Sequence, residues 1–129
     1  MTDALLLDTC ALLWLASGSK SLSRGTRSLI ANAGAVYVSP VSAWEIAVKV
    51  SKGKIILPLE ARQWFEAIVK KYEIEVLKMS YDDMLLSAEL PWHHKDPADR
   101  FIIATALKNG LTVVTADGNF KKYGVTTIC

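Results

Sequence analysis

Two aspartates follow short apolar runs near opposite ends of the chain. LLLDT at residues 5–9 contains Asp8, and LTVVTAD at residues 111–117 ends on Asp117. Apolar runs of this length are typical of strands buried on both faces, as in a parallel sheet, although periodicity alone does not exclude a buried helix. Ligands of open α/β sheets bind beyond the carboxyl ends of the strands, so both carboxylates are candidate site residues. For Asp117 the alternative is a simple turn with Gly118.

A third acid lies on a predicted helix. Glu45 shares a largely apolar helix face with Val41 and Val48, and a carboxylate in such a place needs compensation. The structural alternative is an ion pair with Lys49 at i+4, which contributes only about 0.3 to 0.5 kcal/mol. That is little against the cost of burial, so we interpret Glu45 as functional.

The segment DPADR contains a fourth candidate acid at the start of the last long helix. Asp96 is a good N-cap and Pro97 suits the first helical position. Helix capping therefore explains the presence of Asp96 without any functional role. Asp99 is followed by apolar residues at helical spacing and so is expected to point along the buried stripe toward the sheet. We interpret Asp96 first as a cap and Asp99 first as a site residue.

Other reactive side chains are interpreted mainly as structural. His93 and His94 form no zinc-ligand spacing with Cys10, and we expect them in a loop, where one is a candidate for substrate contact. Cys10 and Cys129 are expected to be reduced packing groups. The tryptophans are expected in the core, with the loop residue Trp92 also a candidate stacking group: Trp14, Trp44, Trp64 and Trp92.

The elements that must position these residues alternate along the chain. Expected strands cover residues 3–8, 35–39, 73–80, 111–117 and 125–128, and expected helices cover 10–16, 21–34, 39–53, 57–72, 80–90 and 96–110. Thr9, Ser39 and Asp96 are the expected N-caps that follow strands or loops, and Pro40 and Gly53 mark the start and end of one helix. Strands separated by helices predict a mostly parallel sheet covered on both faces.

Length and composition agree with one compact domain over residues 1–129. Hydrophobic residues make up 51% and charged residues 22%, which is ordinary for a globular protein. The N-terminus MTDALLLDTC has no basic start and only a short apolar stretch, so we expect neither a signal peptide nor a membrane span. The expected compartment is the cytoplasm.

The formal net charge of +2 is too near balance to identify a partner. Setting aside the four candidate acids, however, leaves 9 acidic residues against 15 basic ones. This surplus suits a polyanionic substrate that approaches an acidic pocket.

Four motifs in order match a known family: LLLDT, SAWEIAVK, HHKDPADRFIIATAL and VVTAD. Together they resemble the PIN domain, and within it the VapC-like toxins of type II toxin-antitoxin pairs. The resemblance implies a three-layer α/β/α sandwich with a mostly parallel five-stranded sheet. It also implies Mg²⁺ or Mn²⁺ dependence, RNA cleavage, inhibition by a small cognate antitoxin and, in agreement with the apolar helices around Trp14 and Trp64, a homodimer.

Carried over by position, the resemblance assigns the four acids to a metal-dependent ribonuclease. Asp8 and Asp99 would ligate the cation directly, Asp117 directly or through water, and Glu45 would orient or deprotonate the attacking water. Thr9 and Thr115 would be supporting hydroxyls and Asp96 an outer acid. The expected products carry 5′-phosphate and 3′-hydroxyl ends.

Physical chemistry explains why such a site needs a cation. Two carboxylates about 5 Å apart repel by roughly 3 kcal/mol at an effective dielectric constant of 20. Oxygen ligands without cysteine or histidine favour hard ions such as magnesium or manganese.

Two rival functions remain open from the sequence. A phosphatase with Asp8 as nucleophile would carry an acid two residues later, where this chain has Cys10. A non-catalytic PIN-fold module for RNA binding or protein interaction is the second alternative, although such modules usually lose acids and all four are present here.

Overall fold

The computed structural model describes residues 4–129 and contains a five-stranded sheet in which all neighbouring strands pair in parallel. The strands are β1 (Ala4–Leu7), β2 (Ala35–Val38), β3 (Glu75–Val76), β4 (Thr112–Val114) and β5 (Thr127–Ile128). The helices are α1 (Thr9–Ser17), α2 (Arg24–Asn32), α3 (Pro40–Ser51), α4 (Ala61–Lys71), α5 (Tyr81–Glu89), α6 (Pro97–Asn109) and the 3₁₀ helix η1 (Gly118–Tyr123).

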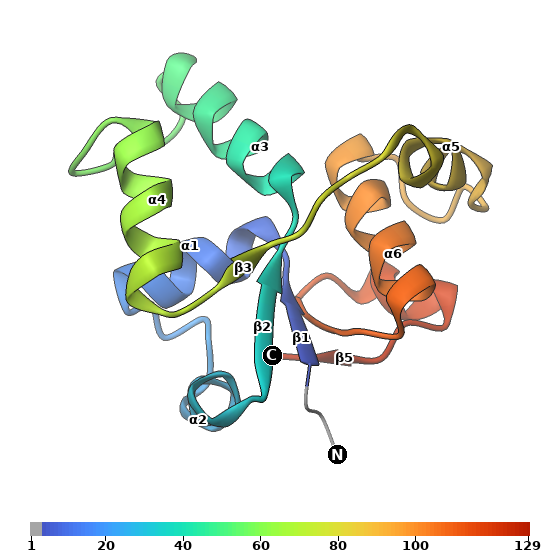
Figure 1. Cartoon of the computed structure of the whole chain (residues 1–129), viewed down its shortest axis with the longest axis horizontal. Helices are drawn as coiled ribbons and strands as arrows, with labels where there is room; N and C mark the ends of the chain where they lie inside the picture. The colour runs from blue at the N-terminus through green and yellow to red at the C-terminus, as the bar shows by residue number, and fades with distance from the viewer. Residues whose placement is uncertain (1–3) are drawn as a thin grey trace.

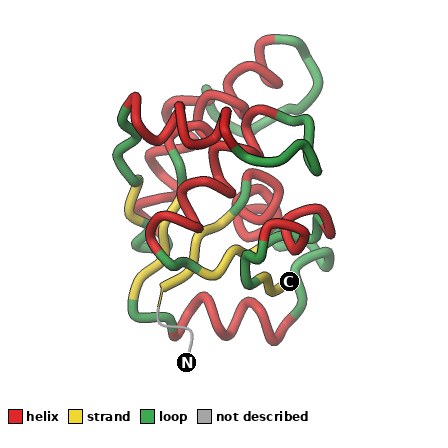
Figure 2. Tube along the Cα trace, turned by 90° about the vertical axis from the view of Figure 1, so that its right-hand side faces the viewer, coloured by secondary structure: helices red, strands yellow, loops and turns green. Residues whose placement is uncertain are grey.

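Helices cover the sheet on both faces, because side chains alternate along the central strand β1. Leu5 and Leu7 pack into a core with α1, α2, α3 and α4, whereas Leu6 packs into a second core with α6 and η1. The two groups of helices stand on either side of the strands in Figure 1, and the side view in Figure 2 shows strands running beside one another as yellow segments. The predicted three-layer α/β/α sandwich is confirmed.

The strand order β3-β2-β1-β4-β5 creates a switch point in the sheet. From β1 the chain builds β2 and β3 on one side and then β4 and β5 on the other. The central strands β1 and β4 stay paired to their carboxyl ends, where the Asp8 N–H donates to the Val114 carbonyl at 3.1 Å. Beyond these ends the chain packs on opposite faces of the sheet, as α1 after β1 and as η1 after β4. Such a point is where open α/β sheets bind ligands.

Several predicted boundaries change in the structure. The strand predicted over residues 73–80 is only Glu75–Val76. It starts late because Glu73 has a left-handed backbone (φ 54°) after the end of α4, and it ends where its neighbour β2 ends, at Val38. The N-cap of α1 is Asp8 rather than Thr9, since Asp8 is extended and its carboxylate accepts the Ala11 N–H. The predicted start of β1 at residue 3 lies outside the described residues.

Some predicted helix ends agree with the structure and others shift by a few residues. Ser39 caps α3 with Pro40 in its first turn, and Asp96 caps α6. The helix predicted over residues 57–72 begins only at Ala61, and α2 ends before Gly34, at a C-cap on Ala33. Within residues 4–129 none of the helices is long and apolar enough to cross a membrane.

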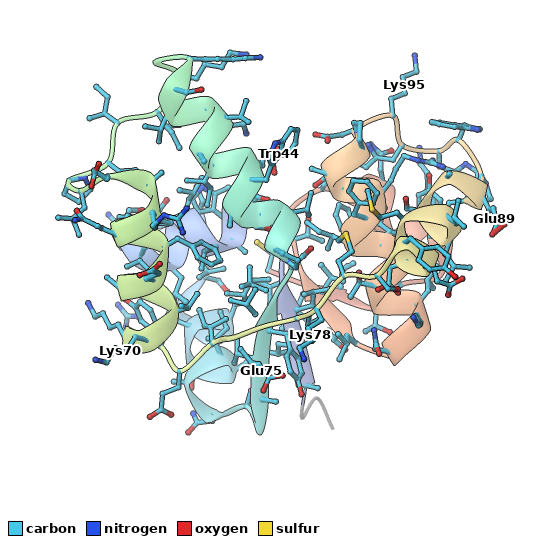
Figure 3. All side chains as sticks on the ribbon, turned by 45° about the horizontal axis from the view of Figure 1, so that its top comes forward. Trp44, Lys70, Glu75, Lys78, Glu89 and Lys95 are labelled. Carbon is cyan, nitrogen blue, oxygen red and sulfur yellow. The ribbon has the colours of Figure 1, made fainter. Side chains whose placement is uncertain are left out.

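The tryptophans divide between core and surface, which corrects the expectation that they are core residues. Trp64 is buried, but Trp44 is 60% and Trp92 is 71% exposed. Trp44 projects from the side of α3 that faces α6 (Figure 3). Trp92 lies in the loop before α6, where its ring covers the Arg100 guanidinium at 3.7 Å.

Candidate active site

The site begins where β1 ends. Asp8 is 5% exposed, and its Oδ1 accepts the Ala11 N–H at 2.7 Å. Burial raises the pKa of Asp8, while the Thr115 hydroxyl and the Ala11 N–H offset part of this effect and the Asp117 charge adds to it. The strand therefore presents a carboxyl group that has lost much of its water.

The end of β4 supplies the second acid. Asp117 accepts the Asn119 N–H at 2.9 Å and so caps η1, a short helix that the sequence did not predict. The Thr115 hydroxyl accepts the Asp117 N–H at 3.0 Å. Asp117 is thus both a turn residue and an acid at the strand end, and the two interpretations of its sequence are compatible.

Helix α6 supplies the third acid from its first turn. Asp99 has a side chain 20% exposed. Burial, followed by the neighbouring Asp96 charge, raises the pKa of Asp99 to about 7, although His94 opposes the shift. Asp96 caps α6 through the Ala98 N–H at 2.9 Å, as predicted, and its charge also faces this site.

Helix α3 supplies Glu45 from the opposite side. Its Oε2 lies 3.6 Å from Lys49 Nζ, so the predicted i+4 ion pair is present but long. Its Oε1 is buried and has no hydrogen-bond partner in residues 4–129. A buried carboxylate oxygen without a partner is costly, which indicates that a cation, a water or a substrate group completes this position.

All four predicted acids line one pocket of about 160 Å³. Its lining residues are Asp8, Thr9, Cys10, Trp14, Glu45, Lys49, Asp96, Asp99, Ala116 and Asp117. Lys49 is the one basic residue in this lining. Thr9 bonds through its hydroxyl to Ser42 at 2.9 Å and so ties α1 to α3 beside the acids.

Cys10 and Cys129 are exposed free thiols rather than buried packing groups, which corrects the expectation for both. Cys10 reaches the rim of the acidic pocket. Partial burial, with the charge of Asp8 second, raises the pKa of the Cys10 thiol. The thiol is therefore neutral near pH 7 and is a poor metal ligand.

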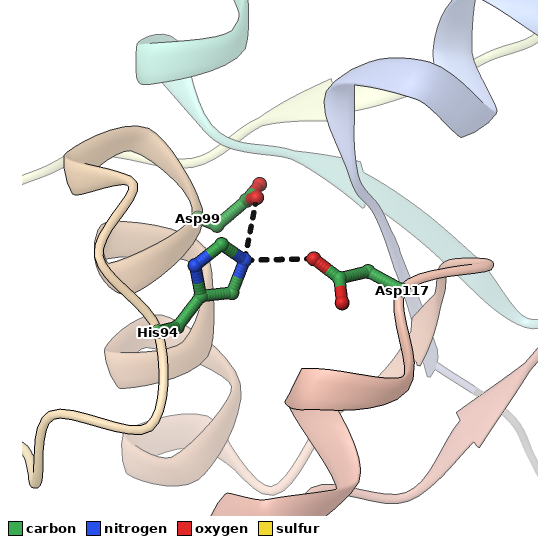
Figure 4. A group of neighbouring side chains, drawn as sticks. All are labelled: His94, Asp99 and Asp117. Atoms are coloured by element: carbon green, nitrogen blue, oxygen red, sulfur yellow. Dashed lines mark hydrogen bonds and ion pairs between the residues drawn. The ribbon is translucent and has the colours of Figure 1, made fainter.

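The structure adds His94 to the site, a residue that the sequence predicts only as part of a loop. His94 turns inward, and its Nε2 lies 2.9 Å from Asp99 Oδ2 and 2.7 Å from Asp117 Oδ2 (Figure 4). Its Nδ1 accepts the Asp96 N–H at 3.2 Å. The HH pair close before DPAD was the available signal in the sequence. A loop sequence, however, does not predict the direction in which a histidine ring points.

The donor set fits a hard divalent cation. After burial, the charges of Asp117 and Glu45 raise the pKa of Asp8, and the charges of Asp96, Asp8 and Glu45 raise that of Asp99. One buried oxygen of Glu45 lacks a partner within residues 4–129. The His94 ring nitrogen nearest the acids is placed as a donor, because the other ring nitrogen accepts a backbone N–H. The ligands available are therefore carboxylate oxygens, which magnesium and manganese prefer.

Comparison with known proteins identifies the class of protein. The family model of the PIN domain matches residues 5–125, and the chain belongs to the PIN domain family. It is 25% identical over 119 residues to a protein named ribonuclease VapC22 from Mycobacterium tuberculosis, covering 92% of this chain and 90% of that one.

Solved structures share the fold. The VapBC2 complex of Rickettsia felis, bound to a promoter DNA fragment, has a TM-score of 0.71 at 16% identity and covers 97% of both chains. A toxin-antitoxin complex from Klebsiella pneumoniae has a TM-score of 0.67 at 20% identity, covering 97% of this chain and 96% of that one. VapC20 of Mycobacterium tuberculosis, described as a toxin that cleaves the sarcin-ricin loop, has a TM-score of 0.66 at 18% identity, covering 95% and 96%.

Proposed function

We propose that residues 1–129 form one nuclease domain, a VapC-like toxin that hydrolyses RNA with a divalent cation. The observation that carries this proposal is the convergence of Asp8, Glu45, Asp99 and Asp117 on one pocket at the switch point of the sheet. The family and the relative named a ribonuclease support the reaction class.

Asp8, Asp99 and Asp117 are the proposed ligands of Mg²⁺, for which Mn²⁺ substitutes. When bound, the cation supplies a water of lowered pKa and positive charge beside the phosphate. Burial, followed by the charges of neighbouring acids, raises the pKa of Asp8 and Asp99, which supports a site where a cation would offset unfavourable negative charge.

Glu45 is the proposed acceptor for the proton of the attacking water. Its free Oε1 faces no donor within residues 4–129, so it can accept a hydrogen bond from that water and orient it. Lys49, whose side chain is 35% exposed beside Glu45, offers its ammonium to the incoming phosphodiester. The proposed supporting groups are the hydroxyls of Thr9 and Thr115 and the outer acid Asp96.

The experiment is incubation of purified protein with labelled RNA in Mg²⁺ and in EDTA. We expect cleavage in Mg²⁺ alone, with fragments that a ligase joins because they carry 5′-phosphate and 3′-hydroxyl ends. Fragments ending in a cyclic phosphate, or equal cleavage in EDTA, would contradict the metal-dependent mechanism. An RNA substrate agrees with the cytoplasmic location expected from the sequence.

A non-catalytic PIN-fold module is the second candidate, because the family match alone does not require turnover. Binding of RNA without any cleavage in Mg²⁺ or Mn²⁺ would favour it. A phosphatase with Asp8 as nucleophile has less support, because Cys10 occupies the position where that chemistry uses an acid.

The proposed partner is a small antitoxin that inserts a basic side chain into the acidic pocket. A guanidinium pairs with two carboxylate oxygens at once, and the pocket carries five acids against one lysine. The toxin-antitoxin complexes that share the fold support this partner. Co-expression with the adjacent small open reading frame is expected to stop RNA cleavage, and full activity of a stable complex would refute the inhibitory contact.

A further inference from the structure

His94 joins the two acids that come from separate elements of the pocket. Asp99 lies on α6 and Asp117 follows β4, and a single ring nitrogen reaches both carboxylates. The side chain of His94 is only 11% exposed, and its ring packs edge-on against the buried Phe120. The contact is therefore largely shielded from solvent.

The hydrogen bonds of the ring determine what Nε2 offers to the carboxylates. Nδ1 accepts the Asp96 N–H and so carries no proton, which places the proton of the neutral imidazole on Nε2. Nε2 then donates to Asp117 Oδ2 at 2.7 Å, and Asp99 Oδ2 lies 2.9 Å from the same nitrogen. A protonated ring nitrogen has no lone pair for a cation, so in this arrangement His94 is not a ligand.

We propose that His94 is a latch that holds Asp99 and Asp117 closed in the metal-free protein and must release them when the cation binds. The proposal deepens the proposed function and rests on it. Oxygen ligands take Mg²⁺ at about 2.0–2.1 Å, and Nε2 lies 2.7 and 2.9 Å from the same two oxygens. The ring and a cation shared by these oxygens therefore compete for one space.

The backbone of the latch is fixed, so release requires rotation of the side chain. The His94 N–H donates to the Tyr123 hydroxyl at 2.9 Å, and the His94 carbonyl accepts from Arg100 at 3.1 Å. These bonds do not involve the ring. The loop can stay in place while the imidazole leaves the carboxylates.

The test is Mn²⁺ titration of the whole chain by calorimetry, without RNA, for wild type, His94→Asn and His93→Asn. An asparagine at position 94 can still accept the Asp96 N–H in a local turn, but it is too short to reach the two acids. His93 is the matched control, because it lies in the same loop, is exposed and packs on Tyr123.

We expect His94→Asn to bind Mn²⁺ about tenfold more tightly than wild type, since the cation no longer displaces a hydrogen bond to charged groups. His93→Asn is expected to match wild type. Weaker binding by His94→Asn would overturn the latch and make His94 a ligand or a support for the acids. Equal binding by all three proteins would also overturn it while leaving the proposed function intact.

One outcome of the Mn²⁺ titration and one NMR measurement distinguish failure of the latch from failure of the proposed function. If neither wild type nor His94→Asn bound Mn²⁺, the metal-dependent function itself would fail, and the latch with it. In ¹⁵N-histidine NMR of wild type, Mg²⁺ is expected to shift the His94 ring resonances and to leave those of His93 unchanged. Unchanged His94 resonances at saturating Mg²⁺ would refute the latch even if the variant folded poorly.

Discussion

At the scale of single residues, carboxylates proposed to take part in the chemistry also cap helices. Asp8 caps α1, Asp117 caps η1 and Asp96 caps α6, and all three line the pocket. The N-terminal ends of these helices carry partial positive charge, which favours nearby carboxylates. This arrangement explains how a chain without a cation tolerates so many acids in one place.

The raised pKa of Asp99 predicts a stability that depends on pH in the metal-free protein. Its pKa rises from 3.8 to about 7 on folding, mainly through burial and then Asp96. The folded state thus holds a proton that the unfolded chain releases, so the contribution is fully present below pH 3.8 and is lost as pH rises through about 7.

Urea unfolding in EDTA at about pH 6 and about pH 8 measures this dependence. Wild type is expected to lose stability at the higher pH, and Asp99→Asn is expected to lose less because its amide does not titrate. Equal losses in both proteins would show that Asp99 does not carry the effect.

The sequence predicted the acids of the site better than their partners. Glu45 and Asp99 could be found because a carboxylate on an apolar helix face is unusual, and Asp8 because it follows a buried strand. The inward turn of His94 could not be predicted, since it depends on Arg100 and Tyr123 holding the loop from distant positions. Such contacts exist only once α6 and η1 have packed together.

At the scale of elements, Arg100 organises the approach to the site. Its guanidinium is 3% exposed and donates to five carbonyl oxygens between residues 87 and 94. It therefore joins the end of α5 and the following loop to α6. The sequence did not identify this role, because a helical arginine beside acids also suits a surface ion pair.

Arg100→Lys is expected to lower the free energy of unfolding by roughly 3 kcal/mol, because an ammonium cannot serve the same fork of acceptors and leaves buried carbonyls unpaired. Urea denaturation measures the change. Arg24→Lys, at an exposed position on α2, is the matched control and should change stability by no more than about 0.5 kcal/mol. Similar values for both variants would mean that the carbonyl contacts contribute little.

The β-strands show which strand boundaries the local sequence does not predict. Residues 73–80 are predicted as one strand, yet only Glu75–Val76 pair, because Glu73 has a left-handed backbone after α4 and β2 turns into α3 at Ser39. The central strands β1 and β4 were predicted well, since both are buried on two faces and read as continuous apolar runs. Edge strands depend on the length of their neighbour, which the local sequence does not contain.

At the scale of the whole molecule, exposed apolar side chains support the predicted homodimer. The expectation that apolar surface around Trp64 forms the dimer contact is wrong, because Trp64 lies in the core. Trp44, Tyr81, Leu85 and Trp92 are instead all more than half exposed, and large exposed apolar groups favour association. Light scattering at micromolar concentration without antitoxin is expected to give twice the chain mass of 14.2 kDa, and a stable monomer would remove the prediction.

The RNA cleavage rate of Asp8→Asn in Mg²⁺ tests most directly whether the acid cluster binds the catalytic cation. Asparagine is as good an N-cap as aspartate, so α1 keeps its bond to the Ala11 N–H while the pocket loses one charge and one metal ligand. We expect the metal-free variant to melt at the wild-type temperature or above it. Mg²⁺ should raise the melting temperature of wild type clearly and that of the variant little, since a ligand stabilises only the state it binds. Cleavage is expected to fall by more than about a hundredfold, to the background of a reaction without enzyme. A folded Asp8→Asn protein that cleaves RNA at the wild-type rate would contradict the account.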